Sequence, residues 1–181
     1  MTMLGEITIG VAIAGRACAG LVFATAAAGK MRHWRFLEGV IANYRLLPGA
    51  LVRPVAMALP PVELALGAAL LLGVAAREAA MAGALLLLLF AAAMAVNIAR
   101  GRSHIDCGCH RSVLRQTLSR ALVGRNIALA AMLLPSLRVG AAGPEMIVTG
   151  FFAGLMLFLL YHLLNLILAI SNRNIPLEYP A

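Results

Sequence analysis

The sequence predicts an all-α membrane protein, a polytopic bundle of four core transmembrane helices plus a fifth. Of its 181 residues, 62% are hydrophobic and only 12% are charged, and the mean hydropathy is +0.93. Soluble domains do not have this composition. Several apolar runs reach the length of about 20 residues that a helix needs to cross a bilayer. The sequence shows no internal repeat and no second domain, so residues 1–181 are expected to form a single integral membrane domain.

The apolar runs predict spans at about residues 7–28, 55–76, 79–99, 121–137 and 146–170, with a polar loop over residues 100–120. The first run lacks the leading positive charge of a cleaved signal peptide, so we expect it to be retained. The segment after it contains Trp34 and Tyr44 and should lie at the membrane interface. Arg77 and Glu78 alone separate the second and third runs, which predicts a tight antiparallel hairpin. The fourth run is short and contains Pro135, so it either spans or lies partly in the interface.

The net charge of +8 does not indicate a nucleic-acid-binding domain in so apolar a chain. Excess arginine in a membrane protein reports loop topology and contact with anionic lipid headgroups. We therefore expect membrane lipid, and no nucleic acid, among the partners. Most of the lysine and arginine residues fall in the two long loops and the C-terminal segment. The positive-inside rule would place that face in the cytoplasm.

Two charged residues fall inside the predicted spans. Arg16 lies about nine residues into the first span and Glu63 about eight into the second, at depths of about 13 and 20 Å from one face. An unpaired charge at such depth is costly, so we expect the two side chains to be hydrogen-bonded to each other. The pair would fix the register of the helices. Alternatively, it would form a polar hub beneath a reactive loop or part of an ion path.

The last apolar run carries two further polar features. His162 and Asn165 are three residues apart and so share a face of the helix. A buried imidazole there could donate a hydrogen bond to a quinone carbonyl or relay a proton, but more often such a residue is an interhelical hydrogen-bonding group. Gly150 and Gly154 have the spacing that lets helices approach closely in lipid.

The polar loop contains the motif Cys107-Gly108-Cys109. A disulfide between residues i and i+2 needs a bend, and the central glycine permits one. The small ring should be strained and oxidising, which suits a disulfide donor or relay rather than a structural staple. Cys18 lies about 15 Å below this loop along the first helix and should be a small buried apolar residue.

The residues that flank the two cysteines bear on their chemistry. Arg102 and Arg111 would favour the thiolate, whereas Asp106 works against it. His104, His110 and the two cysteines offer four nitrogen and sulfur ligands for a metal ion. The adjacent cysteine and histidine match the usual ligand separations poorly, so we favour redox chemistry and expect no metal. An inert loop is the remaining alternative.

Residues spread over positions 10 to 110 together carry a resemblance to a known family. They are Arg16, Gly20, Phe23, Gly29-Lys30, Tyr44-Arg45-Leu46-Leu47-Pro48, Pro60-Pro61-Val62-Glu63, Gly67, Gly73 and Asp106-Cys107-Gly108-Cys109. In combination they resemble the membrane protein family of methylamine utilisation, MauE, a relative of the DoxX-like four-helix membrane proteins. In that family the CGC is often followed by Phe-Gly, whereas here His110-Arg111 follow.

The resemblance implies a thiol-disulfide redox or assembly protein of the bacterial inner membrane. It implies action with a MauD-like thioredoxin-fold partner in the maturation of periplasmic methylamine dehydrogenase, whose disulfide-rich small subunit would be an indirect client. The plan is similar to quinone-linked disulfide-generating bundles of the vitamin K epoxide reductase and DsbB kind. Those use two cysteine pairs and this chain has one, so no cofactor is certain and a quinone is an option.

Two other functions remain open beside the redox function. A small-solute transporter or channel would use Arg16 and Glu63 to line a path near the midplane. A non-catalytic anchor would merely hold the partner at the membrane. Delivery of disulfides to a periplasmic client requires the CGC loop on the periplasmic side of the membrane. The charge distribution instead favours the cytoplasmic side, so the sequence leaves the orientation of the loop open.

Overall fold

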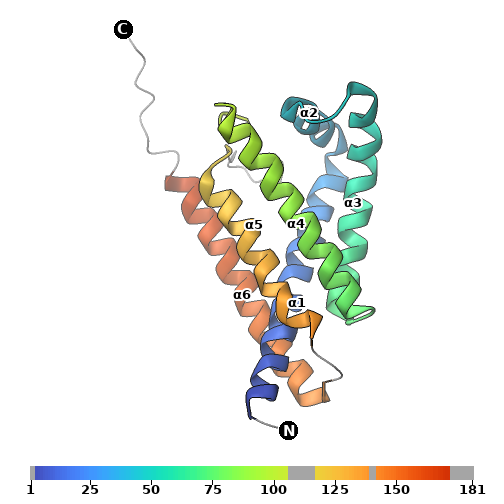
Figure 1. Cartoon of the computed structure of the whole chain (residues 1–181), viewed down its shortest axis with the longest axis vertical. Coiled ribbons are helices and arrows are strands. Elements are labelled where there is room, and N and C mark those ends of the chain that lie inside the picture. Colours follow the sequence, from blue (N-terminus) through green and yellow to red (C-terminus); the bar gives the residue numbers. More distant parts are fainter. Residues whose placement is uncertain (1–2, 106–116, 139–141, 172–181) are drawn as a thin grey trace.

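The computed structural model describes residues 3–105, 117–138 and 142–171, and its regular elements are all helices (Figure 1). In chain order these are α1 (Met3–Arg32), α2 (Trp34–Tyr44), α3 (Gly49–Leu72), α4 (Ala76–Ala99), α5 (Arg120–Leu133), the 3-10 turn η1 (Leu134–Leu137) and α6 (Pro144–Ser171). Four of them, α1, α3, α4 and α6, are long and apolar enough to cross a membrane. The prediction of an all-α, polytopic membrane protein is therefore confirmed.

Helices α1 and α3 are longer than the apolar runs that predicted them. Helix α1 continues to Arg32, so Lys30 is part of the helix and does not follow it. Helix α3 begins at Gly49, directly after Pro48, six residues before the predicted start. It ends at Leu72, and the following Gly73 has a φ of +69°, a left-handed conformation that glycine adopts without steric cost. The extended end of α1 places Lys30 on the helix that faces α3.

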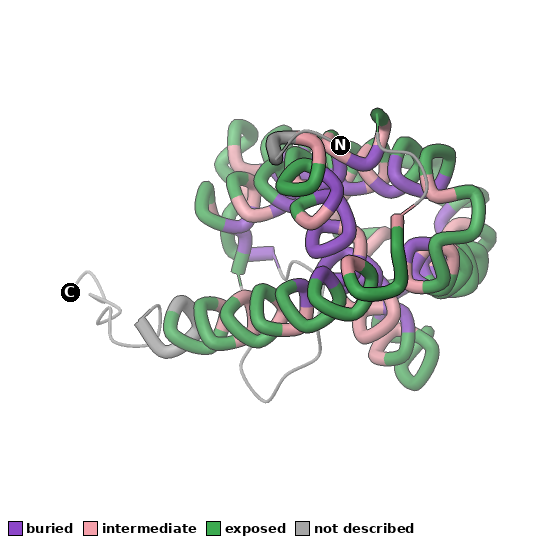
Figure 2. The backbone as a smooth tube through the Cα atoms, turned by 90° about the horizontal axis from the view of Figure 1, so that it is seen from below, coloured by how far each residue is buried: buried purple, intermediate pink, exposed green. Residues whose placement is uncertain are grey.

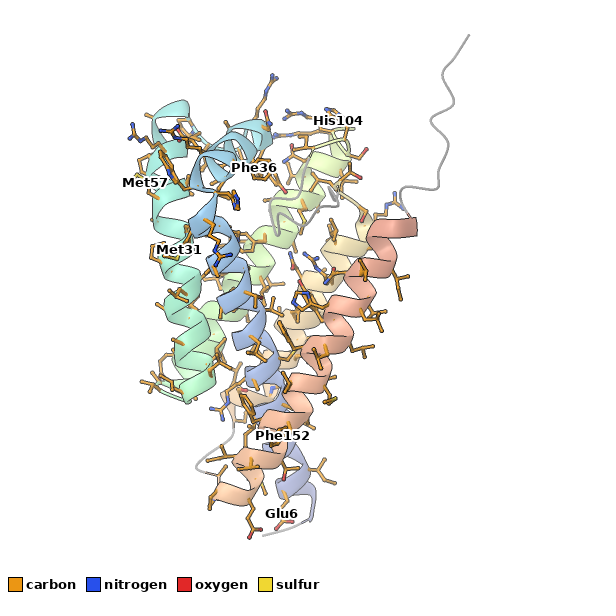
Figure 3. All side chains as sticks on the ribbon, turned by 180° about the vertical axis from the view of Figure 1, so that it is seen from behind. Glu6, Met31, Phe36, Met57, His104 and Phe152 are labelled. Carbon is orange, nitrogen blue, oxygen red and sulfur yellow. The ribbon has the colours of Figure 1, made fainter. Side chains whose placement is uncertain are left out.

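Helix α2 occupies the segment that was expected to lie at the interface. It sits at one end of the bundle, between the end of α1 and the start of α3 (Figure 1). Leu37 and Val40, three residues apart, are buried, and most of its other residues are exposed or half-buried. Such a one-sided helix is typical of an element that lies along the interface. Figure 3 shows Phe36 of α2 and His104 at this same end of the bundle.

Helix α1 is central to the bundle. It packs most extensively against α3 on one side and α6 on another, whereas α4 packs mainly against α5. The predicted hairpin of α3 and α4 is present, joined by a short turn, although each packs more closely on another helix. Figure 2 shows buried residues where helices face one another and α6 exposed along most of its length. Only 11% of the most apolar window of α6 is buried, so a narrow face holds this helix to α1.

The fourth predicted run is a helix followed by a 3-10 turn. Helix α5 has 14 residues, or about 21 Å, and it is not among the four helices of membrane length. It runs beside α4 (Figure 1), and Pro135 lies in the 3-10 turn that follows it. Ser136 then donates a hydrogen bond of 3.2 Å to the carbonyl oxygen of Ala12. This contact ties η1 to α1 inside the bundle.

Glycines mark the places where helices approach most closely. A Cβ added to Gly67 of α3 would lie 2.9 Å from the carbonyl oxygen of Gly20 in α1. A Cβ added to Gly154 of α6 would lie 2.6 Å from the carbonyl oxygen of Ala14. Close backbone approach is how small residues stabilise helix pairs in lipid. The predicted packing role of Gly154 is thus confirmed, and Gly20 with Gly67 fixes the register of α1 against α3.

Gly67→Ala should lower the stability of the bundle by about 1–3 kcal/mol, because the added methyl group meets backbone that cannot move independently. Gly10→Ala in α1 is the matched control, since nothing lies within 4 Å of a Cβ there. That control should be neutral or stabilising by up to about 1 kcal/mol, the helix-propensity difference. Thermal unfolding of the two variants in detergent measures the difference. Equal stability of the two would contradict the proposed helix register.

Candidate functional site

The two ends of the CGC segment are anchored at the end of the bundle that carries α2. The N–H of Leu118 donates a hydrogen bond of 3.0 Å to the carbonyl oxygen of Ile105. Both residues are buried in one apolar cluster with Met94 of α4 and Leu122 of α5. The connecting residues, which include the predicted site residues Asp106, Cys107, Gly108, Cys109, His110 and Arg111, lie outside the described residues. The structure therefore locates the base of the CGC segment, which is formed by Ile105 and Leu118.

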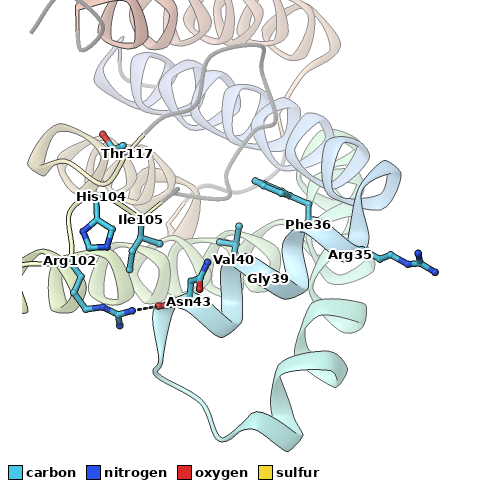
Figure 4. A pocket seen from close by; sticks show the side chains of 9 residues that line it. All are labelled: Arg35, Phe36, Gly39, Val40, Asn43, Arg102, His104, Ile105 and Thr117. Atoms are coloured by element: carbon cyan, nitrogen blue, oxygen red, sulfur yellow. Dashed lines mark hydrogen bonds between the residues drawn. The ribbon is translucent and has the colours of Figure 1, made fainter. Parts of the chain in front are cut away.

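A polar pocket of about 590 Å³ lies against this base (Figure 4). Helix α2 forms one side of it, and Ile105 and Thr117, which flank the CGC segment, belong to the other. Its polar side chains come from both sides and are those of Arg35, Asn43, Arg102, His104 and Thr117. The structure thus brings two of the predicted supporting residues, Arg102 and His104, into one pocket.

Arg102 fastens α2 to the end of α4. One of its terminal nitrogens donates a hydrogen bond of 2.8 Å to the carbonyl oxygen of Asn43, near the C-terminus of α2 (Figure 4). The other donates to Oδ1 of Asn97, at 3.4 Å. Asn97 is fully buried and also donates from Nδ2 to the carbonyl oxygen of Ala93, at 3.1 Å. A cation at a helix C-terminus is electrostatically favourable, so Arg102 holds the wall of the pocket in place.

Arg102→Ala should loosen α2, with a loss of about 1–3 kcal/mol of local stability, because two charge-assisted hydrogen bonds are removed. Hydrogen exchange of the α2 amides, followed by mass spectrometry, should become faster. Arg100→Ala removes an exposed arginine two residues away and is the control. If both variants left α2 equally protected, Arg102 would not be what holds this helix.

The predicted pair of Arg16 and Glu63 is wrong. Both residues lie four positions N-terminal to the facing glycines Gly20 and Gly67. Because α1 and α3 are antiparallel, the two side chains start on opposite sides of that contact, about 12 Å apart along the bundle. Arg16 instead approaches Gly73, at 3.6 Å from a Cβ built there.

Glu63 forms its ion pair with Lys30, from Nζ to Oε1. The side chains are 9% and 1% exposed, respectively. Lys30 also stands over the ring of Phe90 of α4, at 5.1 Å from its centroid. Sequence reasoning missed Lys30 because it placed the end of the first span at residue 28, so that Lys30 seemed to lie beyond it. The usable signal was the helical spacing that continues through Gly29-Lys30.

Helix α6 is linked to α5 through the predicted Asn165. Its Oδ1 accepts a hydrogen bond of 2.8 Å from Arg125, and its Nδ2 donates to the carbonyl oxygen of Tyr161, also at 2.8 Å. Arg125 lies 5.5 Å from the centroid of the Tyr161 ring. His162 packs edge-on against Phe158, with ring centroids 4.5 Å apart. Asn165 is thus an interhelical hydrogen-bonding group, and Arg125 is a partner that the sequence alone did not assign.

Two other predictions concern Cys18, which the structure describes, and a metal site, of which it describes one candidate ligand. Cys18 is buried, with 1% exposure, in the core cluster that joins α1 to its neighbours. It is the small core residue that was predicted. Among the described residues, no group of three or more His, Cys, Asp and Glu side chains could hold a metal ion. Of the four candidate ligands around the CGC motif, His104 is the one that the structure describes.

The fold and the site define a multi-pass helical membrane protein in which Ile105 and Leu118, on either side of the segment that contains Cys-Gly-Cys, are joined beside a polar pocket. The model of the family described as methylamine utilisation protein MauE matches residues 8–137. The chain therefore belongs to the MauE family. The match covers α1 to η1 and confirms the resemblance drawn from the motifs.

Curated relatives extend this match over most of the chain. The methylamine utilization protein MauE of Methylorubrum extorquens is 45% identical over 148 residues, which cover 78% of each chain. That of Paracoccus denitrificans is 44% identical over 145 residues, again 78% of each chain. That of Paracoccus versutus is 43% identical over 159 residues and 84% of each chain. No solved structure matches this chain.

Proposed function

We propose that this chain is a thiol-disulfide redox protein of the bacterial inner membrane that serves methylamine utilisation. In this proposal Cys107 and Cys109 exchange disulfide equivalents with a MauD-like, thioredoxin-fold partner. The observation that carries it is the anchored base of the CGC segment, where Ile105 and Leu118 are tied together beside an open polar pocket. Membership of the MauE family supports a role of this chain in methylamine utilisation.

The exchange begins with a disulfide between Cys107 and Cys109. A thiolate of the partner attacks one sulfur, a mixed disulfide forms, and the other cysteine leaves as a thiolate. The partner's second thiolate then attacks the mixed disulfide. The partner is left with a disulfide and this chain with a dithiol, so two electrons and two protons have passed to the membrane protein. The partner would carry its disulfide to the small subunit of methylamine dehydrogenase.

The pocket supports this exchange in two ways. Arg102 lines it beside the base of the segment (Figure 4), and nearby positive charge lowers the cost of forming a thiolate. The hydrogen bonds of Arg102 hold α2 against the end of α4, so the surface offered to the partner is preformed. A rigid surface loses less entropy when a partner binds.

Trapping of the mixed disulfide tests the proposal. Cys107→Ser and Cys109→Ser are expressed in turn with the partner. Acid stops thiol exchange, and maleimide then blocks the free thiols. The complexes are identified by non-reducing electrophoresis and mass spectrometry. A variant with one loop cysteine has no disulfide to give, so its thiolate would enter the mixed disulfide by attacking the disulfide of the oxidised partner. Without the second loop cysteine it cannot release the partner in its reduced form, so one of the two single variants should accumulate a covalent complex with the thioredoxin-fold protein. The double variant should form none. Absence of a trapped complex from both single variants would leave the anchor function as the better explanation.

A membrane-impermeant maleimide tests whether the CGC segment faces the periplasm, as exchange on behalf of a periplasmic client requires. In intact cells with a permeabilised outer membrane, it should label the reduced Cys107 and Cys109 from the periplasmic side. Labelling only after the inner membrane is opened would place the segment in the cytoplasm, as the charge distribution favours, and would exclude direct exchange with a periplasmic partner. Both labelling experiments use a chain that carries Cys18→Ser, so that the signal comes from the two loop cysteines. Cys18 is buried, so this change does not alter the surface.

A further inference from the structure

A second pocket, of about 560 Å³, lies among α2, α3 and α4. Its volume is within the range of about 300–1,000 Å³ that is usual for small-molecule sites. Among the side chains that line it, those of Lys30 and Tyr44 alone carry polar groups, and the others are aliphatic, aromatic or methionine. Two of its walls are helices of membrane length. Such a lining selects an apolar ligand that comes from the lipid phase.

Lys30 gives this pocket one strong hydrogen-bond donor. Its side chain is 9% exposed, and its ammonium group donates to Glu63, which is itself 1% exposed and does not belong to the lining. An ammonium group has three N–H donors, so the bond to Glu63 leaves donor capacity for a ligand. The ring of Phe90, 5.1 Å from Nζ, lies beside the same group.

The charge balance of the pocket decides between kinds of ligand. Glu63 neutralises Lys30, so together they present a donor without net positive charge. A phospholipid phosphate would need an unpaired cation to offset its loss of hydration. An uncharged carbonyl group needs only the donor. The geometry therefore favours an uncharged carbonyl compound that is otherwise apolar.

The pocket shares its walls with the base of the CGC segment. Met94 and Tyr44 line the pocket. Met94 is also buried in the cluster that contains Ile105 and Leu118, and Tyr44 packs against that cluster. Val40 lines both this pocket and the polar pocket beside the segment. By contrast, neither pocket is lined by His162 or Asn165, which the sequence offered as either a quinone site or a hydrogen-bonding site.

We infer that this pocket binds the ring of an isoprenoid quinone, with Lys30 donating a hydrogen bond to one of its carbonyl oxygens. The ring packs among the apolar side chains, and the tail extends into the bilayer. The bound quinone would take two electrons and two protons from the Cys107 and Cys109 dithiol, so that the disulfide is restored and a quinol leaves. This last step rests on the proposed function, whereas binding does not.

Binding is measured on the full chain in nanodiscs of phosphatidylcholine, with a short-chain ubiquinone as the probe. Trp34 is the single tryptophan of the chain and lies on α2, which lines the pocket, so its quenching reports the titration. Ala93→Phe should fill the pocket and weaken saturable binding roughly tenfold or more. Ala82→Phe adds the same ring to an exposed position of the same helix and should bind as the unmodified chain does.

The double variant Lys30→Met with Glu63→Leu tests the donor, because it removes both charges and leaves neither one buried alone. It should bind the probe roughly tenfold more weakly. Equal affinity in all variants would overturn the inference. So would a phospholipid that co-purifies in stoichiometric amount, is lost in Ala93→Phe and is not displaced by the quinone. Because the titration needs no thiol exchange, its failure would leave the proposed function standing, and failure of the trapping experiment would leave quinone binding standing.

Discussion

Replacement of Cys107 or Cys109 with serine should abolish maturation of the disulfide-rich small subunit of methylamine dehydrogenase. A single thiol can enter a mixed disulfide but cannot complete the transfer of two electrons, so no catalytic cycle remains. The measurement is methylamine dehydrogenase activity in the periplasmic fraction of cells that carry each variant, with the redox state of the small subunit read by alkylation. Activity should fall to the level of a strain that lacks this protein.

The control for this experiment separates chemistry from folding. Cys18→Ser changes a thiol that is buried in the helix core, and should leave the activity close to its normal level. The loop variants should reach the membrane in normal amount, since they leave every residue of the two described core clusters unchanged. Full client maturation in the double loop variant would refute the redox function, as would stoichiometric zinc on these cysteines.

Glu63→Ala should be the most destabilising single change inside the bundle, by about 3–5 kcal/mol, because it leaves the ammonium group of Lys30 buried without its counter-charge. Thermal unfolding and the folded yield in detergent both measure the loss. Glu78→Ala removes an exposed glutamate at the start of α4 and should cost less than about 1 kcal/mol.

A second variant identifies the partner of Glu63. Lys30→Met combined with Glu63→Leu should recover most of the stability, since neither charge is then left unpaired in an apolar environment. Arg16→Met combined with Glu63→Leu should not, because Arg16 lies on the other side of the contact between Gly20 and Gly67. Rescue by the Arg16 combination and not by the Lys30 combination would show that the two helices pack in another register.

The class of protein, its membrane spans and its family could be predicted from the sequence. Apolar length is a property of a continuous segment, so the runs that became α1, α3, α4 and α6 are visible without any tertiary contact. The CGC motif and the residues around Gly20, Glu63 and Gly67 are likewise local patterns, and they lie within the part of the chain that the family model matches. Differences at this level concerned the helix ends, which depend on turns and caps as well as hydropathy, and the fourth run, which is too short a helix to be among the four of membrane length.

The tertiary structure alone decided which polar groups meet. Glu63 has Arg16 and Lys30 on the same neighbouring helix, and the choice between them follows from helix register, which the backbone contact between Gly20 and Gly67 sets. The link between Arg125 and Asn165 and the two pockets beside α2 also join residues distant in sequence. A shift of one helix by a single turn, about 5.4 Å, would leave every span intact and exchange these partners. Hydropathy constrains depth in the membrane, whereas close packing between helices determines register and therefore the site.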